Sequence, residues 1–194
     1  MTSNYSQLSI DPLSSNQIAV TITYLEQTER PALVMPPAPS IGQRRNVALM
    51  RVEQPPVHFY RYMYDLVGAP FNWISRRTMS DDDLAAILHD ENVYFYVLYV
   101  GGAPAGLAEI DARNETTHEI KFFGLAPDFT GLGLGRYFFT NVLDLAWSRA
   151  PQCLKLETCT LDHPAALPLY QKFGFKVTGR RQGFVQRLIP NQQK

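Results

Sequence analysis

Three glycines at alternate positions, Gly131, Gly133 and Gly135, are the residues of this sequence best suited to bind a phosphate. Glycine tolerates positive φ and lets the backbone approach a ligand closely. The glycines follow a strand-like stretch, and apolar residues at helical spacing follow them. The first amides of such a helix have no partners within it and lie at the positive end of its dipole. With the positive charge of Arg136, this stretch predicts a loop that binds a phosphate-bearing ligand.

Two common phosphate motifs fit the loop poorly. A P-loop requires Lys and then Ser or Thr after its last glycine, whereas this chain has Arg136-Tyr137. The dinucleotide fingerprint spaces its glycines as G-x-G-x-x-G, whereas the spacing here is G-x-G-x-G. A glycine-rich turn that only begins a helix is the alternative, and the loop by itself leaves that alternative open.

A second stretch adds chemistry downstream of the loop. Residues 161–175, LDHPAALPLYQKFGF, place Asp162 before a short predicted helix and Tyr170 within it. Together the two stretches resemble the signatures of the GNAT superfamily of N-acetyltransferases: the acetyl-CoA pyrophosphate loop Q/R-x-x-G-x-G/A and the motif N-x-x-A-x-x-L-Y-x-K-x-G-F. Their order and spacing match, and the resemblance covers about residue 46 to the C-terminus. Two positions depart from it: Thr130 replaces Gln or Arg, and Asp162 replaces Asn.

The resemblance implies an α/β (α+β) fold, with a central mixed, mostly antiparallel twisted sheet of about seven strands flanked by helices. The chain pattern agrees: a strand, two helices, three strands, a helix, a strand, a helix and two strands follow residue 46. The last two strands are expected at 175–178 and 184–189. An extra N-terminal strand is expected around Ile18–Tyr24, followed by a proline-rich loop. We therefore expect a single domain over 1–194, made of an extension (1–45) and a core (46–194).

Composition narrows the class of protein. The 18 acidic and 18 basic residues balance, so no nucleic-acid-binding surface is expected. The longest apolar run is broken by glycines and a proline, and the N-terminus lacks a signal-peptide pattern, so no membrane segment is expected. Cys153 and Cys159 on one predicted strand would lie about 20 Å apart, too far to bridge. We expect a cytoplasmic protein that is a monomer or a homodimer.

The resemblance implies acetyl-CoA as co-substrate. Its pantetheine arm would enter between the strand before the glycine loop and the next strand, and the loop amides would bind its pyrophosphate. The cofactor-binding residues expected on this basis are Phe123, Leu125, Ala126, Thr130, Gly131, Gly133, Gly135, Arg136, Asp162 and Ala166.

Acetyl transfer to an amine requires a base for the nitrogen, a donor for the oxyanion and a proton for the departing thiolate. By resemblance, Tyr170 is the expected acid beside the cofactor sulfur. Glu119, on the strand before the loop, is the expected base, and Glu109 on the preceding strand is the alternative. A tyrosine packed on the sheet and carboxylates on a solvated strand edge would explain all three without catalysis. The His, Cys and Asp spacings predict no metal site.

The resemblance also implies that the first two helices and their connection wall the acceptor pocket. The candidate substrate-binding residues are Tyr60, Tyr64, Trp73 and Arg77. Their aromatic faces suit an apolar or cationic amine, whereas Arg76 or Arg77 would suit a carboxylate. The proline-rich segment could fold over as a lid, which favours a small-molecule amine or an amino-acid-like acceptor.

The sequence thus predicts an acetyl-CoA-dependent N-acetyltransferase that works by direct general acid/base-assisted attack on a primary amine. A catalytically silent acyl-CoA-binding or sensor module and a protein N-acetyltransferase are the alternatives, and an adaptor acting through the proline-rich segment is a weaker one. The presence of both Glu119 and Tyr170 favours an enzyme over the silent module.

Overall fold

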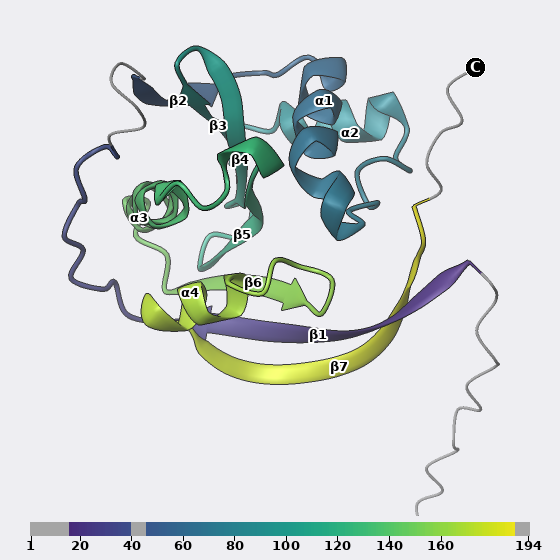
Figure 1. The fold of residues 1–194 in the computed structure, drawn as a ribbon. Helices are drawn as coiled ribbons and strands as arrows, with labels where there is room; N and C mark the ends of the chain where they lie inside the picture. Colours follow the sequence, from purple (N-terminus) through teal and green to yellow (C-terminus); the bar gives the residue numbers. More distant parts are fainter. Residues whose placement is uncertain (1–15, 40–45, 189–194) are drawn as a thin grey trace, which may run out of the picture.

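The computed structural model describes residues 16–39 and 46–188, which form one sheet flanked by helices on both faces (Figure 1). The parts of the expected extension at 1–15 and 40–45, and Ile189 of the last expected strand, lie outside these ranges. In chain order the described elements, with η for short 3-10 helices, are β1 (Gln17–Gln27), β2 (Val47–Val52), α1 (Val57–Gly68), η2 (Ala69–Phe71), α2 (Asp81–Leu88), β3 (Val93–Val100), β4 (Ala103–Asp111), β5 (Thr117–Leu125), η3 (Pro127–Phe129), α3 (Leu134–Trp147), β6 (Cys153–Cys159), α4 (Ala166–Lys172) and β7 (Lys176–Gln186).

The strand order of the seven-stranded sheet is β2-β3-β4-β5-β6-β1-β7. All neighbours are antiparallel except β5 and β6, which are parallel and connected through α3. A parallel pair needs a crossover of this kind, whereas the β3–β4 hairpin closes with the two glycines Gly101 and Gly102 at positive φ. The expected mixed, mostly antiparallel fold is confirmed, and so is the additional N-terminal strand.

One expectation about the C-terminus is wrong. The sequence suggested two strands at 175–178 and 184–189, but β7 is continuous from Lys176 to Gln186. It is continuous because β1 pairs with it along its length, from Gln17–Gln186 to Glu26–Lys176. The middle of β7 contains Gly179 and Gly183, which weaken a strand signal but lie opposite Tyr24 and Val20 in this ladder. The N-terminal strand is therefore an inner strand of the sheet and not an appendage.

Apolar side chains fill both faces of the sheet. One cluster packs α3 and α4 against one face, and the other packs α1 and α2 against the opposite face (Figure 1). Ser80 caps α2, because its hydroxyl accepts a hydrogen bond from the Asp83 amide at 3.1 Å. The described part of the proline-rich segment packs beside α3. Leu33 packs against the apolar cluster of α3 and α4, and Arg30 forms an ion pair with Asp144 of α3 at 2.6 Å.

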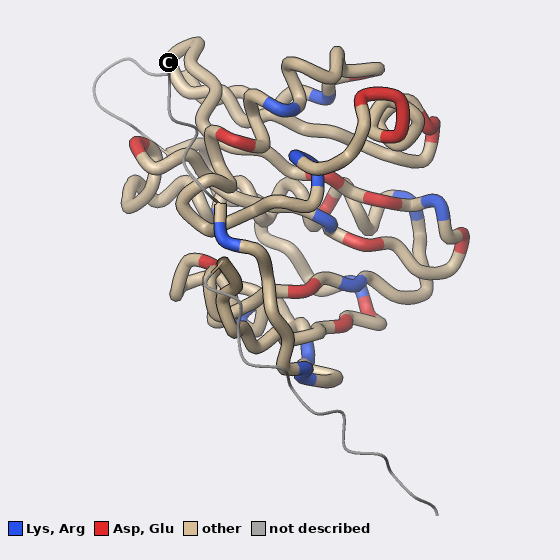
Figure 2. Tube along the Cα trace, turned by 90° about the vertical axis from the view of Figure 1, so that its right-hand side faces the viewer, with Lys and Arg blue, Asp and Glu red and all other residues tan. Residues whose placement is uncertain are grey.

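Charged residues of both signs are interspersed along the described chain (Figure 2). Several of them form ion pairs, such as Arg113 with Asp111 at 2.6 Å and Lys155 with Glu26 at 3.3 Å. Within the described ranges, no helix is both long and apolar enough to cross a membrane.

Candidate active site

Strands β5 and β6 separate partway along the sheet, and a cavity of about 580 Å³ opens where they diverge. They pair only over Thr117–Glu119 and Cys153–Lys155. Beyond these residues, Lys121–Leu125 of β5 and Leu156–Cys159 of β6 form facing walls of the cavity. The glycine loop lies at one end, and the α1–α2 connection together with β1 and β7 lies at the other. Its volume is in the range of small-molecule sites.

The glycine loop presents open backbone to the cavity. Gly131 and Gly133 have φ of 73° and 75°, a region costly for residues with a side chain, and a Cβ at either would meet no atom within 4 Å. Gly133 is the N-cap of α3, and no side chain caps the helix. The first-turn amides of α3 therefore remain available to a phosphate.

Strand β5 is distorted beside the cavity. Its pairing with β4 shifts between Glu109–Phe122 and Ile110–Ile120, which leaves Lys121 without a partner on β4. Such a bulge bends the strand and releases backbone groups from the ladder. Because Lys121, Phe122 and Phe123 all line the cavity, the bulge brings irregular backbone to the point where the two strands part.

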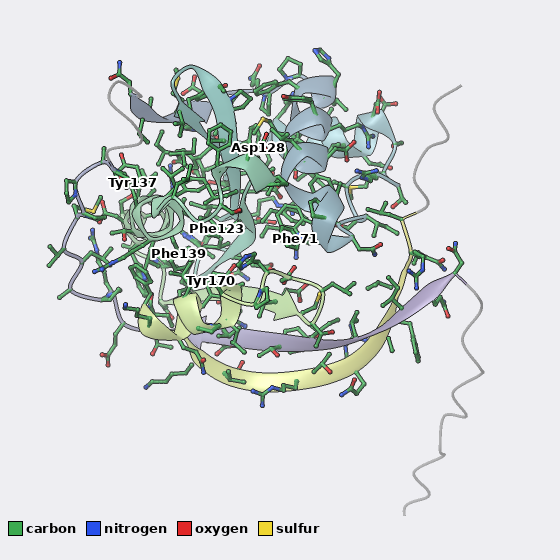
Figure 3. All side chains as sticks on the ribbon, viewed as in Figure 1. Phe71, Phe123, Asp128, Tyr137, Phe139 and Tyr170 are labelled. Carbon is green, nitrogen blue, oxygen red and sulfur yellow. The ribbon has the colours of Figure 1, made fainter. Side chains whose placement is uncertain are left out.

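Tyr170 projects from α4 into the cavity. The centroid of its ring lies 5.1 Å from that of Phe139 on α3, and the ring of Phe139 lies 4.9 Å from that of Phe123 on β5 (Figure 3). This aromatic packing fixes the orientation of the Tyr170 side chain. The side chain is 7% exposed. Burial, assisted by the negative charge of Asp162, raises the pKa of the Tyr170 hydroxyl far above its usual value. The hydroxyl is therefore protonated at neutral pH and can donate.

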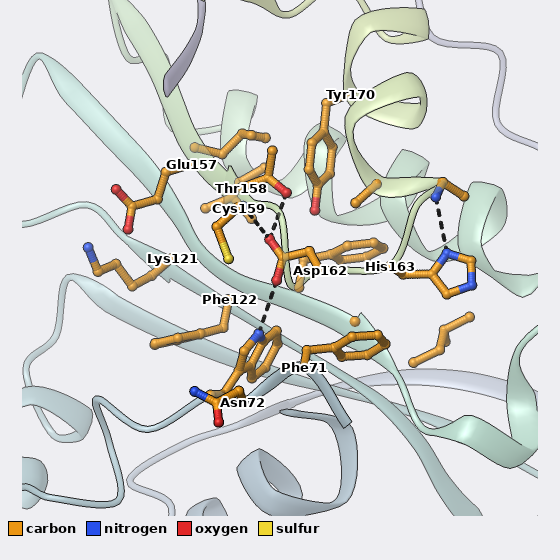
Figure 4. Close-up of a pocket in the computed structure, with 18 of the residues that line it drawn as sticks. Phe71, Asn72, Lys121, Phe122, Glu157, Thr158, Cys159, Asp162, His163 and Tyr170 are labelled. Atoms are coloured by element: carbon orange, nitrogen blue, oxygen red, sulfur yellow. Dashed lines mark hydrogen bonds between the residues drawn. The ribbon is translucent and has the colours of Figure 1, made fainter. Parts of the chain in front are cut away.

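Asp162 lies in the loop between β6 and α4, on the cavity wall (Figure 4). Its Oδ2 atom accepts hydrogen bonds from the Thr158 hydroxyl at 2.6 Å and the Cys159 amide at 2.8 Å. Its Oδ1 atom accepts a long hydrogen bond from Trp73 Nε1 at 3.5 Å. The carboxylate thus joins β6 to the α1–α2 connection across the cavity.

Residues 71–75 of the α1–α2 connection wall the far end of the cavity. The ring of Trp73 fits against two glycines, because a Cβ at Gly68 would overlap the ring and one at Gly124 would lie 3.6 Å from it. Asn72, in the left-handed region at φ 58°, donates to the Gln186 carbonyl and accepts from the Leu188 amide, both at 2.7 Å. The connection is therefore held to the end of β7.

Four residues from the two long strands β1 and β7 complete this end of the cavity: Val20, Ile22, Val185 and Gln186. None of these four residues was predicted as a site residue. Alternation identified β1 as a strand, but only its position between β6 and β7 brings it to the cavity. The sequence carries no local signal for that pairing.

Glu109 is fully buried in a polar cluster away from the cavity lining. It accepts a hydrogen bond from the Tyr60 hydroxyl and pairs with Arg76 at 2.5 Å. Burial and the negative charge of Glu109 raise the pKa of Tyr60 well above its usual value. Because Arg76 ends the segment that carries Trp73, this cluster fixes the cavity wall from behind.

Replacing Glu109 by Gln is expected to destabilise the fold by about 3–5 kcal/mol, because it leaves the buried Arg76 guanidinium without its counter-charge. Denaturant unfolding followed by fluorescence measures the loss. The double variant Glu109→Gln/Arg76→Met is the control, since it removes both charges and is expected to recover most of the stability. Unchanged stability of Glu109→Gln would contradict a structural role for the pair.

Glu119 lies outside the lining of this cavity. It borders a second hollow of about 430 Å³, together with Lys121 and Glu157, which line both spaces. Lys121 Nζ lies 3.0 Å from Glu119 Oε1. The two carboxylates predicted as bases are therefore either buried in an ion pair or outside the cavity, and both assignments stay predictions.

Some of the remaining predicted site residues line the cavity and others do not. Tyr64 and Trp73 line the cavity, whereas Tyr60 is buried behind it and Arg77 lies 2.6 Å from Asp65, without hydrogen-bond alignment. Of the predicted cofactor residues, the cavity is lined by Phe123, Leu125, Thr130, Gly131, Gly135, Asp162 and Ala166. Ala126, Gly133 and Arg136 do not line it. None of the described residues of the proline-rich segment lines it either, so they form no lid over it.

Comparison with solved structures supports the same fold. A conserved protein of unknown function from Staphylococcus epidermidis matches with a TM-score of 0.58 and 18% identity, over 89% of this chain and 64% of its own. An aminoglycoside acetyltransferase from an uncultured soil metagenomic sample matches at 0.54 and 14% identity, over 66% and 87%. A spermidine/spermine N-acetyltransferase from Vibrio cholerae matches at 0.51 and 18% identity, over 73% and 95%.

The present chain spans less than two thirds of the Staphylococcus epidermidis protein, and these identities establish similarity of fold alone. No curated protein matches this chain by sequence. A family model described as acetyltransferase (GNAT) family matches residues 60–175, which include the glycine loop, both separating strands and Tyr170. The chain belongs to the GNAT acetyltransferase family.

Proposed function

We propose that this protein is an acetyl-CoA-dependent N-acetyltransferase that acts on a primary amine of a small molecule. The observation that carries the proposal is a single cavity that joins the open glycine loop to the buried hydroxyl of Tyr170, between two strands that separate. A phosphate-binding loop at one end and a proton donor at the centre are what transfer from a CoA thioester requires. Family membership supports the same reaction class.

In this proposal the cofactor lies between β5 and β6. The pyrophosphate accepts hydrogen bonds from the loop and first-turn amides around Gly131–Arg136. The pantetheine arm follows β5 past Leu125 and Phe123, and the bulge at Lys121–Phe122 supplies backbone donors toward the thioester oxygen. Tyr170 gives its proton to the departing sulfur. Acetyl-CoA itself supplies the activated acetyl group.

The acceptor approaches from the opposite end, past Trp73 and the ends of β1 and β7. Hydrogen bonds from Asn72 to β7 and from Trp73 to Asp162 bridge this end. A bridged end favours a small molecule over a protein tail. Two of the structural matches, the aminoglycoside acetyltransferase and the spermidine/spermine N-acetyltransferase, are also named after small molecules.

Two measurements on the full chain test the proposal. Isothermal titration is expected to show acetyl-CoA binding, and a panel of amines is expected to release free CoA in its presence, monitored with a thiol reagent. Acetyl-CoA binding without release of CoA by any amine would favour the silent acyl-CoA-binding module. Failure to bind acetyl-CoA would contradict both functions.

A further inference from the structure

We propose that Asp162 receives the acceptor's amine in the active site, and that the acceptor is a primary amine carried on an apolar body. This inference rests on the proposed acetyltransferase function and adds to it the group that accepts the amine's proton and the chemical class of the acceptor. It follows from the hydrogen bonds of Asp162, its place in the cavity and the residues around the acceptor's end.

The Asp162 carboxylate is held in position but not saturated. Oδ2 uses both its lone pairs on Thr158 and Cys159, which lock the side chain to the end of β6. Oδ1 receives only the 3.5 Å bond from Trp73, at the limit of hydrogen bonding. One oxygen is thus free to take a strong charge-assisted hydrogen bond from an ammonium or amine.

The position of Asp162 relates it to the proton donor. In Figure 4 its carboxylate lies between Tyr170 on one side and Phe71 on the other. The negative charge of Asp162 raises the pKa of Tyr170, and Asp162 accepts a hydrogen bond from Trp73. The carboxylate is therefore close to both the proposed acid and the acceptor's end of the cavity. An amine bound to Oδ1 would approach the thioester from the side opposite the glycine loop.

An aspartate also differs from the asparagine of the family motif in one relevant property. Both residues can accept hydrogen bonds from Thr158 and Cys159, so either satisfies the loop. Only the carboxylate carries a negative charge and can accept a proton. The departure from the motif is therefore not needed for the hydrogen bonds from Thr158 and Cys159, and it adds a base at the cavity wall.

Other ionisable groups near the cavity are less suited to this role. Glu109 is buried in its pair with Arg76, and Glu119 lies in the second hollow beside Lys121. Glu157 lines the cavity but is exposed and borders the second hollow as well. His163 is exposed, and its Nδ1 atom accepts from the Ala165 amide at 3.2 Å.

The walls beyond Asp162 are mainly apolar. They comprise Val20, Ile22, Phe71, Trp73, Ile74 and Val185. Asp162 is the carboxylate beside these side chains, because Glu157 lies at the border with the second hollow, so this end fits one amine attached to an aromatic or aliphatic body. A polyamine that placed its further ammonium groups against these apolar walls would meet a desolvation cost with no ionic partner among them.

The proposed step balances in atoms and charge. The acceptor enters as an ammonium and loses one proton before its nitrogen attacks the thioester. It loses a second proton as the N–C bond forms and the C–S bond breaks. Asp162 accepts these protons in turn and passes them to water. Tyr170 gives its hydroxyl proton to sulfur and regains one from water. The products are the acetamide, free CoA and one proton released to solvent.

Asp162→Asn is the test, because its side-chain oxygen can keep the hydrogen bonds from Thr158 and Cys159, whereas the change removes the charge, the base and the acceptor of the long bond from Trp73. With 2-phenylethylamine as acceptor, kcat/KM is expected to fall by about 100-fold, the low end of general-base effects, while acetyl-CoA affinity is unchanged. With O-benzylhydroxylamine, which has a similar shape but an amine that is neutral at pH 7, the loss is expected to be much smaller. Asp82→Asn, which makes the same change at an exposed aspartate of α2 outside the cavity lining, is the matched control and is expected to retain activity.

Each outcome separates the two levels of the proposal. Wild-type turnover of both acceptors by Asp162→Asn would overturn the role of Asp162 and leave the acetyltransferase function standing. Loss of activity in Glu119→Gln instead would assign the base to Glu119. Faster turnover of spermidine than of 2-phenylethylamine would overturn the acceptor class. If the wild-type protein acetylates no amine, the proposed function fails, and this inference fails with it.

Discussion

Gly133→Asp is expected to lower acetyl-CoA affinity by at least about 100-fold, which corresponds to roughly 2.7 kcal/mol. The glycine has φ of 75° and caps α3, whose amides are the proposed pyrophosphate donors. A carboxylate here would accept those amides itself and repel the diphosphate. Isothermal titration of acetyl-CoA measures the loss directly, and it does not depend on knowing the acceptor.

The chain offers a matched control for the backbone strain in this variant. Gly102, in the β3–β4 turn, has a φ of 85°, and a Cβ there also meets no atom within 4 Å. Gly102→Asp therefore imposes a similar left-handed strain away from the glycine loop and the start of α3, and this variant is expected to lower stability but to bind acetyl-CoA normally. Equal loss of binding in both variants would indicate strain alone and contradict a phosphate role for the loop.

Several elements of this fold carry their signals locally in the sequence. Ser80 with the acidic residues after it marks the start of α2, and Gly101-Gly102 marks the β3–β4 hairpin. A glycine pair between alternating stretches specifies a turn whatever the rest of the chain does. The glycine loop and the helix after it were likewise visible, because a few adjacent residues determine them.

The position of β1 could not be predicted in this way. Its partners on β7 lie about 150–170 residues further along the chain, and alternation indicates a strand without indicating its neighbours. Consequently Val20 and Ile22 were not expected in the cavity, and β7 was divided into two strands. Pairing over such distances is decided by the packing of the whole sheet.

The roles of the two glutamates show the same limit. On sequence alone Glu109 and Glu119 are equivalent strand carboxylates, yet one is fully buried and the other borders a surface hollow. The difference arises from Arg76 and Tyr60, which come from elements distant in sequence. In the same helix, Tyr60 and Tyr64 lie one turn apart, but only Tyr64 lines the cavity. Neither distinction has a local signal.

Tyr170→Phe is expected to lower kcat by about 100-fold or more, in the range of general acid catalysis, and to leave acetyl-CoA affinity nearly unchanged. The ring that packs on Phe139 is retained, and only the hydroxyl is lost. Among the hydrogen bonds of the described residues, none uses this hydroxyl, so its removal leaves no protein partner unsatisfied. Thermal unfolding is therefore expected to show little change.

The pH dependence of the wild-type protein tests the same assignment. The protonated hydroxyl of Tyr170 is the neutral form. Burial, and to a lesser extent the negative charge of Asp162, raises the pKa of this hydroxyl, so folding favours the protonated acid. The stability that this raised pKa contributes is fully present below about pH 10, the pKa of tyrosine in the unfolded chain. It is lost only as the pH rises through the pKa of Tyr170 in the folded protein. Ionisation of Tyr170 should therefore cause no fall in kcat up to about pH 9. An alkaline limb near neutrality that vanishes in Tyr170→Phe would contradict a protonated acid, and unchanged kcat in that variant would remove Tyr170 from the mechanism.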